Sequence, residues 1–257
     1  MTPLERFLTV TLGETIVGGL RYAIAAGLAW LLCYVFFGQR WSHRKIVAEA
    51  PARADVRREL LCSALSVVVY ALVGAAGVLA IQAGWTQMYF RIGLHGWLWF
   101  AASLGIAILI HDAYFYWTHR AMHHPRIFRW MHRTHHRSMN PTPWAAYAFN
   151  PLEAFVHACI FPLVIFTVPI HPLAFFLFMA WQITFNVLGH AGFEFYPRWF
   201  LRSPLGYFIN TPTNHVMHHQ YLRGNYGLYF NFWDRLMHTN HERYEERFEE
   251  VTSRPRA

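Results

Sequence analysis

The sequence is poor in charged residues, and its positive charge is almost entirely arginine. Only 14% of its 257 residues are charged, whereas a typical soluble chain carries about 25%. Apolar residues make up 55% and aromatic residues 18%, a composition that favours a membrane protein. Lys45 is the only lysine, and the net charge is +8. The arginines flank apolar segments instead of forming one polar domain, which indicates contact with anionic lipid headgroups and not with nucleic acid.

Cysteine is scarce, and several common motifs are absent. The three cysteines, Cys33, Cys62 and Cys159, lie in apolar runs and form no C-x-x-C pair, so we expect neither a disulfide nor a thiolate metal site. The H-E-x-x-H motif of zinc hydrolases does not occur. The N-terminus lacks a basic region followed by a cleavable apolar core, so no signal peptide is predicted.

Apolar segments predict an all-α integral membrane protein with about five transmembrane helices. They cover residues 16–37, 60–83, 97–110, 153–168 and 173–189. The polar stretch between the first two is rich in arginine, which marks the cytoplasmic side. We therefore expect the N-terminus outside, and the histidine-rich segments and the C-terminus inside. The last two apolar segments predict a hairpin, and the charged run 242–250 predicts a solvated helix.

Histidine, in contrast, is abundant and clustered. Seven of the 17 histidines lie between His111 and His136, and the unit H-x-x-H-H occurs twice, at residues 132–136 and 215–219. Spacings of three and four residues bring side chains to one face of a helix. Neutral imidazole is a common ligand of iron, zinc and copper. A lone histidine is more often packed in a core, but spaced clusters predict a metal centre.

Nine histidines are candidate ligands, enough for two metal ions with four or five ligands each, whereas one structural zinc would use only four. They are His119, His123, His132, His135, His136, His190, His215, His218 and His219. Asp112 and Tyr116 lie within about 40° of the helical line through His119 and His123, so we predict that they orient a ligand. For Asp112, a salt bridge to a nearby arginine is an equal alternative.

The order of these motifs resembles the fatty acid hydroxylase superfamily, which includes sterol desaturases, sterol methyl oxidases and sphingolipid hydroxylases. The motifs are H-D-x-x-F-Y-x-x-H-R-x-x-H, H-x-x-H-H, G-H-x-G-x-E, a second H-x-x-H-H and N-Y-G-x-x-x-x-x-W-D-R. They extend from about His111 to Met237, half of the chain. Residues 1–90 carry no motif of this family.

The resemblance implies an integral membrane enzyme with two histidine-bound iron ions in a cytoplasmic helical cap. Such enzymes use O₂ and two electrons to oxidise an unactivated C–H bond, and the nine histidines correspond to their ligands. Some hydroxylases have a longer first box, which makes His124 an alternative to His123. A further histidine of some members corresponds to Asn186, and the usual Gly-Thr after W-D-R is His238-Thr239 here.

We therefore predict hydroxylation of a membrane lipid, in preference to desaturation, by a catalytic domain in residues 91–241. A transmembrane region in 1–90 precedes it, and a charged tail in 242–257 follows. No cytochrome-like H-P-G-G or iron–sulfur cysteine pattern occurs, so we expect a separate electron-donor protein. We expect the protein in a bacterial inner membrane, with the active site on the cytoplasmic side.

The alternative function is a membrane metal-binding or metal-transport protein. Transporters place ionisable residues near the middle of the membrane, whereas these histidines follow the ends of apolar segments. The sequence therefore favours the oxidase.

Overall fold

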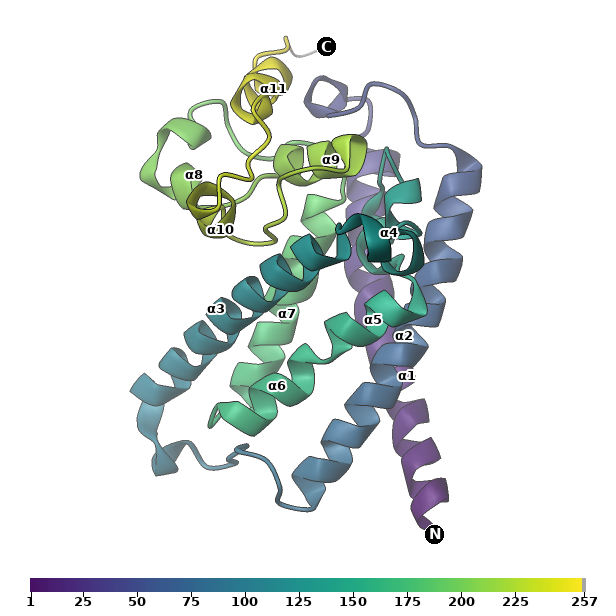
Figure 1. The fold of residues 1–257 in the computed structure, drawn as a ribbon, viewed down its shortest axis with the longest axis vertical. Helices are drawn as coiled ribbons and strands as arrows, with labels where there is room; N and C mark the ends of the chain where they lie inside the picture. The colour runs from purple at the N-terminus through teal and green to yellow at the C-terminus, as the bar shows by residue number, and fades with distance from the viewer. Residues whose placement is uncertain (256–257) are drawn as a thin grey trace.

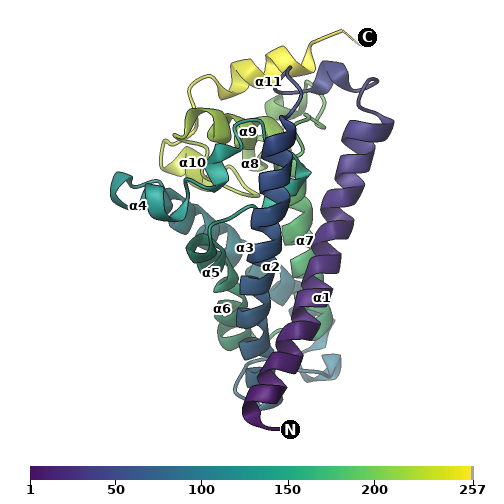
Figure 2. The ribbon, with the colours of Figure 1, turned by 90° about the vertical axis from the view of Figure 1, so that its right-hand side faces the viewer.

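The computed structural model describes residues 1–255 and is all-helical, which confirms the predicted fold class. Four helices are long and apolar enough to cross a membrane: α1 with its π-helical end (Pro3–Phe36), α2 (Arg53–Gln82), α3 (Gly96–Met122) and α7 (Pro172–Gly189). They extend from the N-terminal end of the molecule toward a cap of shorter helices beside the C-terminus (Figure 1). Helices α1 and α2 pack against each other on one side (Figure 2).

The first helix, α1 (Pro3–Trp30), shows why these segments suit a lipid environment. The Thr2 hydroxyl accepts a hydrogen bond from the Glu5 amide, and the Glu5 carboxylate accepts one from the Thr2 amide, so the helix starts at Pro3. Large apolar side chains then project outward along the helix. They include Leu8, Leu12, Ile16, Leu20, Ile24 and Leu28. Lipid solvates such a row, whereas water would not.

The apolar segment 153–168 is not one spanning helix. It is divided into α5 (Pro151–Ala158) and α6 (Ile160–Thr167), which meet at Cys159. Pro162 explains the division, because proline has no amide hydrogen and its ring clashes with the carbonyl four residues earlier. The 17 residues of the pair are fewer than the roughly 20 that a span needs. Residues 1–255 therefore contain four helices of sufficient length, and the segment predicted as the fourth of five spans is a broken helix that packs against α2.

The cap consists of short helices. They are α4 (Pro125–Met131), α8 (Pro204–Phe208), α9 (Pro212–Tyr221), α10 (Phe232–Leu236) and α11 (Tyr244–Thr252). The charged run that we predicted as a solvated helix is α11, but only one face of it is solvated. Tyr244, Phe248 and Val251 are buried on the other face, where α11 packs against α9.

The predicted domain boundary at residue 90 stays a prediction. Helices α1 and α2 pack against the 3-10 turn η5 (Pro143–Tyr147), and α1 also contacts α7. The last two residues of the predicted tail, 256–257, lie outside the described residues.

The arginine distribution predicts that the stretch before α2 and the end of α11 lie in the cytoplasm. In a cysteine-free background, Ala52→Cys and Ser253→Cys, both at exposed positions, should be protected from an impermeant thiol reagent in intact cells. Gln87→Cys, in the loop at the opposite end of α2, should react. Labelling of Cys at 52 or 253 from outside would overturn this topology.

Candidate metal centre

The nine predicted histidines converge from four parts of the chain. The end of α3 carries His119 and His123, the turns after α4 carry three, the end of α7 carries His190, and α9 carries three. All are buried except His123, which is partly exposed. Helices α3 and α7 therefore deliver three of the nine histidines where they reach the cap, and segments of the cap supply the other six.

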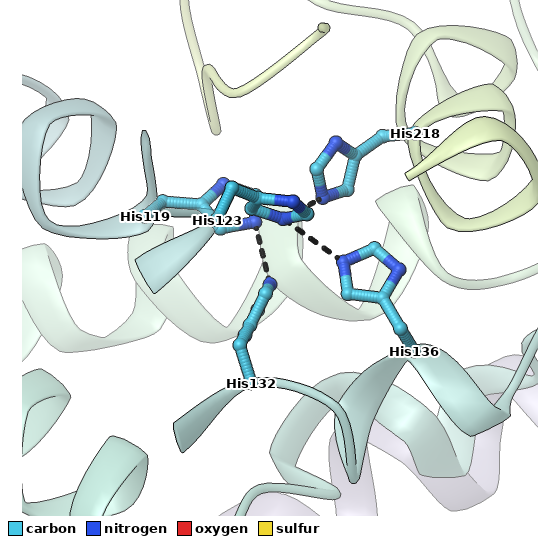
Figure 3. A group of neighbouring side chains, drawn as sticks. All are labelled: His119, His123, His132, His136 and His218. Atoms are coloured by element: carbon cyan, nitrogen blue, oxygen red, sulfur yellow. Dashed lines mark hydrogen bonds between the residues drawn. The ribbon is translucent and has the colours of Figure 1, made fainter. Parts of the chain in front are cut away.

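The structure divides the nine into two groups whose ligand atoms all lie within 4.8 Å of one another. The five-histidine group is His119, His123, His132, His136 and His218 (Figure 3). The four-histidine group is His135, His190, His215 and His219. The groups are adjacent, since the ring centroids of His136 and His219 are 4.9 Å apart. This arrangement could hold two neighbouring metal ions.

Each H-x-x-H-H motif is divided between the groups. In residues 215–219, the first and last histidines join the four-histidine group and His218 joins the other. The motif at 132–136 does the reverse: His135 joins the four-histidine group and its neighbours join the five-histidine group. Adjacent residues in a helical turn point about 100° apart. Two adjacent histidines therefore suit two different ions.

Spacing within the groups fits metal binding. The Nε2 atoms of His119 and His132 are 3.0 Å apart, and those of His190 and His215 are 2.9 Å apart. Two nitrogens that bind one ion at about 2.1 Å lie about 3.0–3.4 Å from each other. Both ring nitrogens of His219 are buried and have no hydrogen-bond partner in residues 1–255. A metal ion would satisfy such an orphaned nitrogen.

Burial keeps these imidazoles in the neutral form that binds metals. It lowers the pKa of His123 and of His190 to about 4. Burial, reinforced by neighbouring histidines, also lowers the pKa of His135 and His218 well below the ordinary value. At neutral pH the rings are therefore unprotonated and available as ligands.

A short loop after α9 orients three rings of the five-histidine group. The Nδ1–H groups of His123, His218 and His119 donate to the carbonyl oxygens of Leu222, Gly224 and Tyr226, at 3.0, 2.7 and 2.8 Å. A carbonyl oxygen only accepts, so Nδ1 must carry the proton and Nε2 presents its lone pair to the group. Backbone carbonyls are common partners of metal-bound histidine.

Left-handed backbone lets the loop turn its carbonyls inward. Leu222, Gly224 and Asn225 have φ of 59°, 72° and 55°, values that glycine and asparagine tolerate best. The amides of Tyr226 and Gly227 donate to the Asp234 carboxylate at 2.9 and 2.6 Å. The N-Y-G and W-D-R segments of the last motif are therefore hydrogen-bonded to each other. Together they position the Tyr226 carbonyl, which accepts the hydrogen bond from His119.

Two further carboxylates position histidines. The His132 Nδ1–H donates to Glu153 Oε1 at 2.5 Å, an interaction that raises the basicity of a metal-binding ring. Glu194 accepts hydrogen bonds from the amide and hydroxyl of Thr213, in the first turn of α9, at 3.0 and 2.7 Å. We did not predict the role of Glu153. The sequence does contain a sign of this role: Glu153 is the one carboxylate in the otherwise apolar segment 153–168.

Two positions left open by the sequence now have a defined geometry. His123 belongs to the five-histidine group, whereas His124 is exposed and its Nδ1 accepts a hydrogen bond from the Arg126 amide. The Asn186 side chain donates to the Ala146 carbonyl. The backbone carbonyl of Asn186 accepts a hydrogen bond from His190 Nδ1 at 2.7 Å. Asn186 therefore orients a ligand candidate through its backbone.

His238, where the resemblance led us to expect glycine, has a φ of 52°. This is the left-handed conformation, which glycine adopts without a steric penalty. The following Thr239 still donates to Asp234 at 2.7 Å.

The two residues predicted to orient a ligand act elsewhere. Asp112 Oδ1 accepts hydrogen bonds from the amides of Tyr229 and Phe230, both at 3.1 Å, and within residues 1–255 no arginine pairs with it. The printed contacts of Asp112 are thus with backbone amides, and its predicted role in orienting a ligand stays a prediction. Tyr116 shares a 2.9 Å hydrogen bond with Thr239. It reaches His119 only indirectly, through Thr239, Asp234 and the Tyr226 carbonyl.

The two groups predict separable losses of metal. We expect about two ions per chain in the wild type and about one in His218→Ala and in His135→Ala, since each removes a ligand from a different group. His124→Ala, a neighbouring histidine outside both groups, is the control and should keep both ions. Metal analysis of the purified proteins measures this. Full metal content in both ligand variants would refute the assignment.

Comparison with known proteins identifies the family. A family model described as fatty acid hydroxylase matches residues 104–239, which contain all nine histidines. The chain is 32% identical over 217 residues to Delta(7)-sterol 5(6)-desaturase ERG3B of Gibberella zeae, over 82% of this chain and 63% of that protein. It is 27% identical over 236 residues to lathosterol oxidase of Mus musculus, over 91% of this chain and 76% of that protein.

The chain thus spans less than two thirds of the first relative. No solved structure matches it. Both relatives are eukaryotic and give no support to the bacterial inner membrane predicted above. The family model covers more than half of the chain and the whole histidine centre. The chain therefore belongs to the fatty acid hydroxylase family, together with the sterol desaturases that it resembles.

Proposed function

We propose that the protein catalyses the O₂-dependent oxidation of a C–H bond in a membrane lipid, with two iron ions held by the nine histidines. One observation carries the proposal: two adjacent groups of neutral imidazoles lie where membrane helices enter the cap. Iron bound there would supply the redox chemistry that activates O₂. The protein supplies neutral imidazoles, five of which have a hydrogen-bond acceptor that fixes the tautomer, and all but one of the nine are buried.

Apolar and aromatic side chains lie between the bilayer and the histidines. A cavity of about 220 Å³, which we call the membrane cavity, lies between α1, α2, α6 and α7. Tyr70, Tyr147 and Phe161 line both this cavity and a smaller space that extends to Phe149 and His157. The Phe149 ring centroid is 4.9 Å from that of His135. The smaller space is only about 20 Å³, so a lipid that reached the four-histidine group this way would have to displace these aromatic side chains, but it would not cross water.

The names of the relatives favour a sterol as the lipid and desaturation as the outcome. Hydroxylation, which we predicted from the sequence, consumes one C–H bond, O₂, two electrons and two protons and yields an alcohol and one water. Desaturation uses the same co-substrates, removes two hydrogens and yields an alkene and two waters. Either reaction needs two electrons, for which we propose a reduced carrier protein as the donor.

The alternative, a metal-binding or metal-transport protein, fits the structure less well. The nine histidines lie in the cap at the ends of the apolar helices, not along a path through the membrane. A transporter needs ionisable groups that an ion can follow across the bilayer.

Membranes that contain the iron-loaded protein, a reduced donor and ¹⁸O₂ test the reaction. A sterol lighter by two hydrogens and free of label would indicate desaturation, and a lipid heavier by one ¹⁸O atom would indicate hydroxylation. His218→Ala should abolish either product. Lipid turnover without O₂, or unchanged lipids despite full iron loading and reduction, would refute the oxidase and favour the metal-binding alternative.

Electrons most readily enter beside His123, the one partly exposed ligand candidate. An open pocket of about 380 Å³ leads to it between Trp117, Arg120 and Tyr226. The segment 126–137, which follows His123 in the chain, carries four exposed arginines that form no ion pair within the described residues. They are Arg126, Arg129, Arg133 and Arg137. We propose that an acidic electron carrier docks on this basic face, since complementary charge accelerates encounter.

Charge reversal tests this docking. The double variant Arg129→Glu/Arg133→Glu should slow reduction of the metal centre by an acidic ferredoxin about tenfold at low salt, and added salt should narrow the difference. Arg91→Glu, an exposed position at the opposite end of the helices, is the control. Stopped-flow reduction measures the rate. An unchanged rate in the double variant would exclude this face.

A further inference from the structure

A positive charge lies inside the first membrane helix. Arg21 is in the interior of α1 and lines the membrane cavity, together with Glu14 two turns earlier on the same helix. Charged side chains within a membrane span are costly and usually mark function. The family model begins at residue 104, so it assigns no role to either residue.

Arg21 has a donor to offer. Its Nε is buried and has no hydrogen-bond partner in the described part of the chain. The guanidinium lies beside Tyr147, whose pKa is raised by burial and partly lowered by the Arg21 charge and by a hydrogen bond from Arg21, so Nε is the donor that stays free. The next residue, Tyr22, fixes α1 against the 3-10 turn η5. Its hydroxyl donates to the Trp144 carbonyl at 2.7 Å, and its ring stacks on that of Tyr147 with the ring centroids 5.0 Å apart. An unsatisfied donor in a held helix is suited to an incoming acceptor.

Glu14 balances the charge without occupying this donor. A Cβ at Gly74 would lie 3.3 Å from Glu14 Oε2, so glycine on α2 leaves room for the carboxylate at the cavity wall. Among residues 1–255, Glu14 and Arg21 form no ion pair, although both face the same cavity. The cavity therefore contains one charge of each sign and an otherwise apolar lining of Val67, Val78 and Ile81.

These features define the ligand. An anionic lipid would add a net charge to the cavity and be repelled by Glu14, and a pure hydrocarbon would leave the Arg21 donor unsatisfied. A neutral lipid with a hydroxyl group satisfies both, since its oxygen accepts from Arg21. We propose that Arg21, balanced by Glu14, is a recognition site for the hydroxyl end of a neutral lipid.

The position of this site relative to the metal centre gives it a role in specificity. Tyr147 lines the cavity beside Arg21 and also lines the smaller space that reaches Phe149 and His157. A lipid held by its oxygen at Arg21 would have its apolar body in the membrane cavity, and displacement of Tyr147 and Phe149 would bring it toward the four-histidine group. This inference rests on the proposed lipid oxidation, because it identifies the group by which that substrate is selected and positioned.

Binding without turnover tests the site. Purified full-length, metal-loaded protein without an electron donor is incubated with radiolabelled cholesterol, and three competitors are compared: cholesterol, its 3-deoxy analogue and cholesterol sulfate. For the wild type we expect cholesterol to compete at least about tenfold better than either analogue. Arg21→Met should lose the discrimination between cholesterol and the deoxy analogue. Glu14→Gln should lose part of the discrimination against the sulfate.

Controls separate recognition from folding. Arg6→Met removes an exposed arginine at the start of the same helix, where its side chain bonds Gln82, and should keep the wild-type selectivity. Arg21→Lys keeps a charged donor and should retain more discrimination than Arg21→Met, while all variants keep their metal. Equal competition by all three sterols in the wild type, or unchanged selectivity in a folded Arg21→Met, would overturn the site.

The outcomes also distinguish this inference from the proposed function. Selective binding without any oxidation of lipid in the ¹⁸O₂ experiment would support the site and refute the oxidase. Oxidation of lipid with selectivity independent of Arg21 would support the oxidase and refute the site.

Discussion

The structure depends on holding nine neutral imidazoles with their lone pairs directed inward. An isolated imidazole rotates and exchanges its tautomer, so each ring needs an acceptor behind its Nδ1–H. Backbone carbonyls supply it for His119, His123, His190 and His218, and the Glu153 carboxylate supplies it for His132. Four of these five rings belong to the five-histidine group. In the four-histidine group the Nδ1 atoms of His135, His215 and His219 have no such partner within the described chain, so that group is less firmly oriented.

The residues other than histidine in the motifs serve this orientation. Asp234 holds the Tyr226 amide, Glu194 holds the first turn of α9, and Asp112 holds the Tyr229–Phe230 backbone. Each carboxylate saturates backbone donors in a buried loop, where an unsatisfied donor would be costly. These acids are therefore structural supports, and the candidate ligands remain all-nitrogen. Few carboxylates reach the metal centre itself, which agrees with imidazole as the donor type throughout.

The membrane part contributes position and access. Helices α3 and α7 end where their histidines begin, so lipid-embedded segments and metal centre share the same axes. Pro162 breaks the apolar segment between them, and the resulting bend lets α5 place Glu153 beneath His132 while α6 lines the membrane cavity. The break at Pro162 thus has two consequences. It lets α5 support a candidate ligand, and it lets α6 form part of the cavity wall.

Local sequence patterns determined much of this protein. Apolar runs predict the long helices because lipid requires such runs, and histidine spacing predicts the metal centre because three- and four-residue intervals bring ligands to one face. Those signals lie within single segments. The pairing of His119 with His132, the division of each H-x-x-H-H motif between two groups, and the supports at Tyr226 and Glu153 join residues far apart in the chain. Only the tertiary structure decided them, because the partner of a buried polar atom depends on which segments meet in space. Asp112 is an example of what spacing alone does not predict. Its position on the helix relative to His119 suggested a contact with a ligand, but its Oδ1 accepts a hydrogen bond from the backbone of a loop more than a hundred residues later.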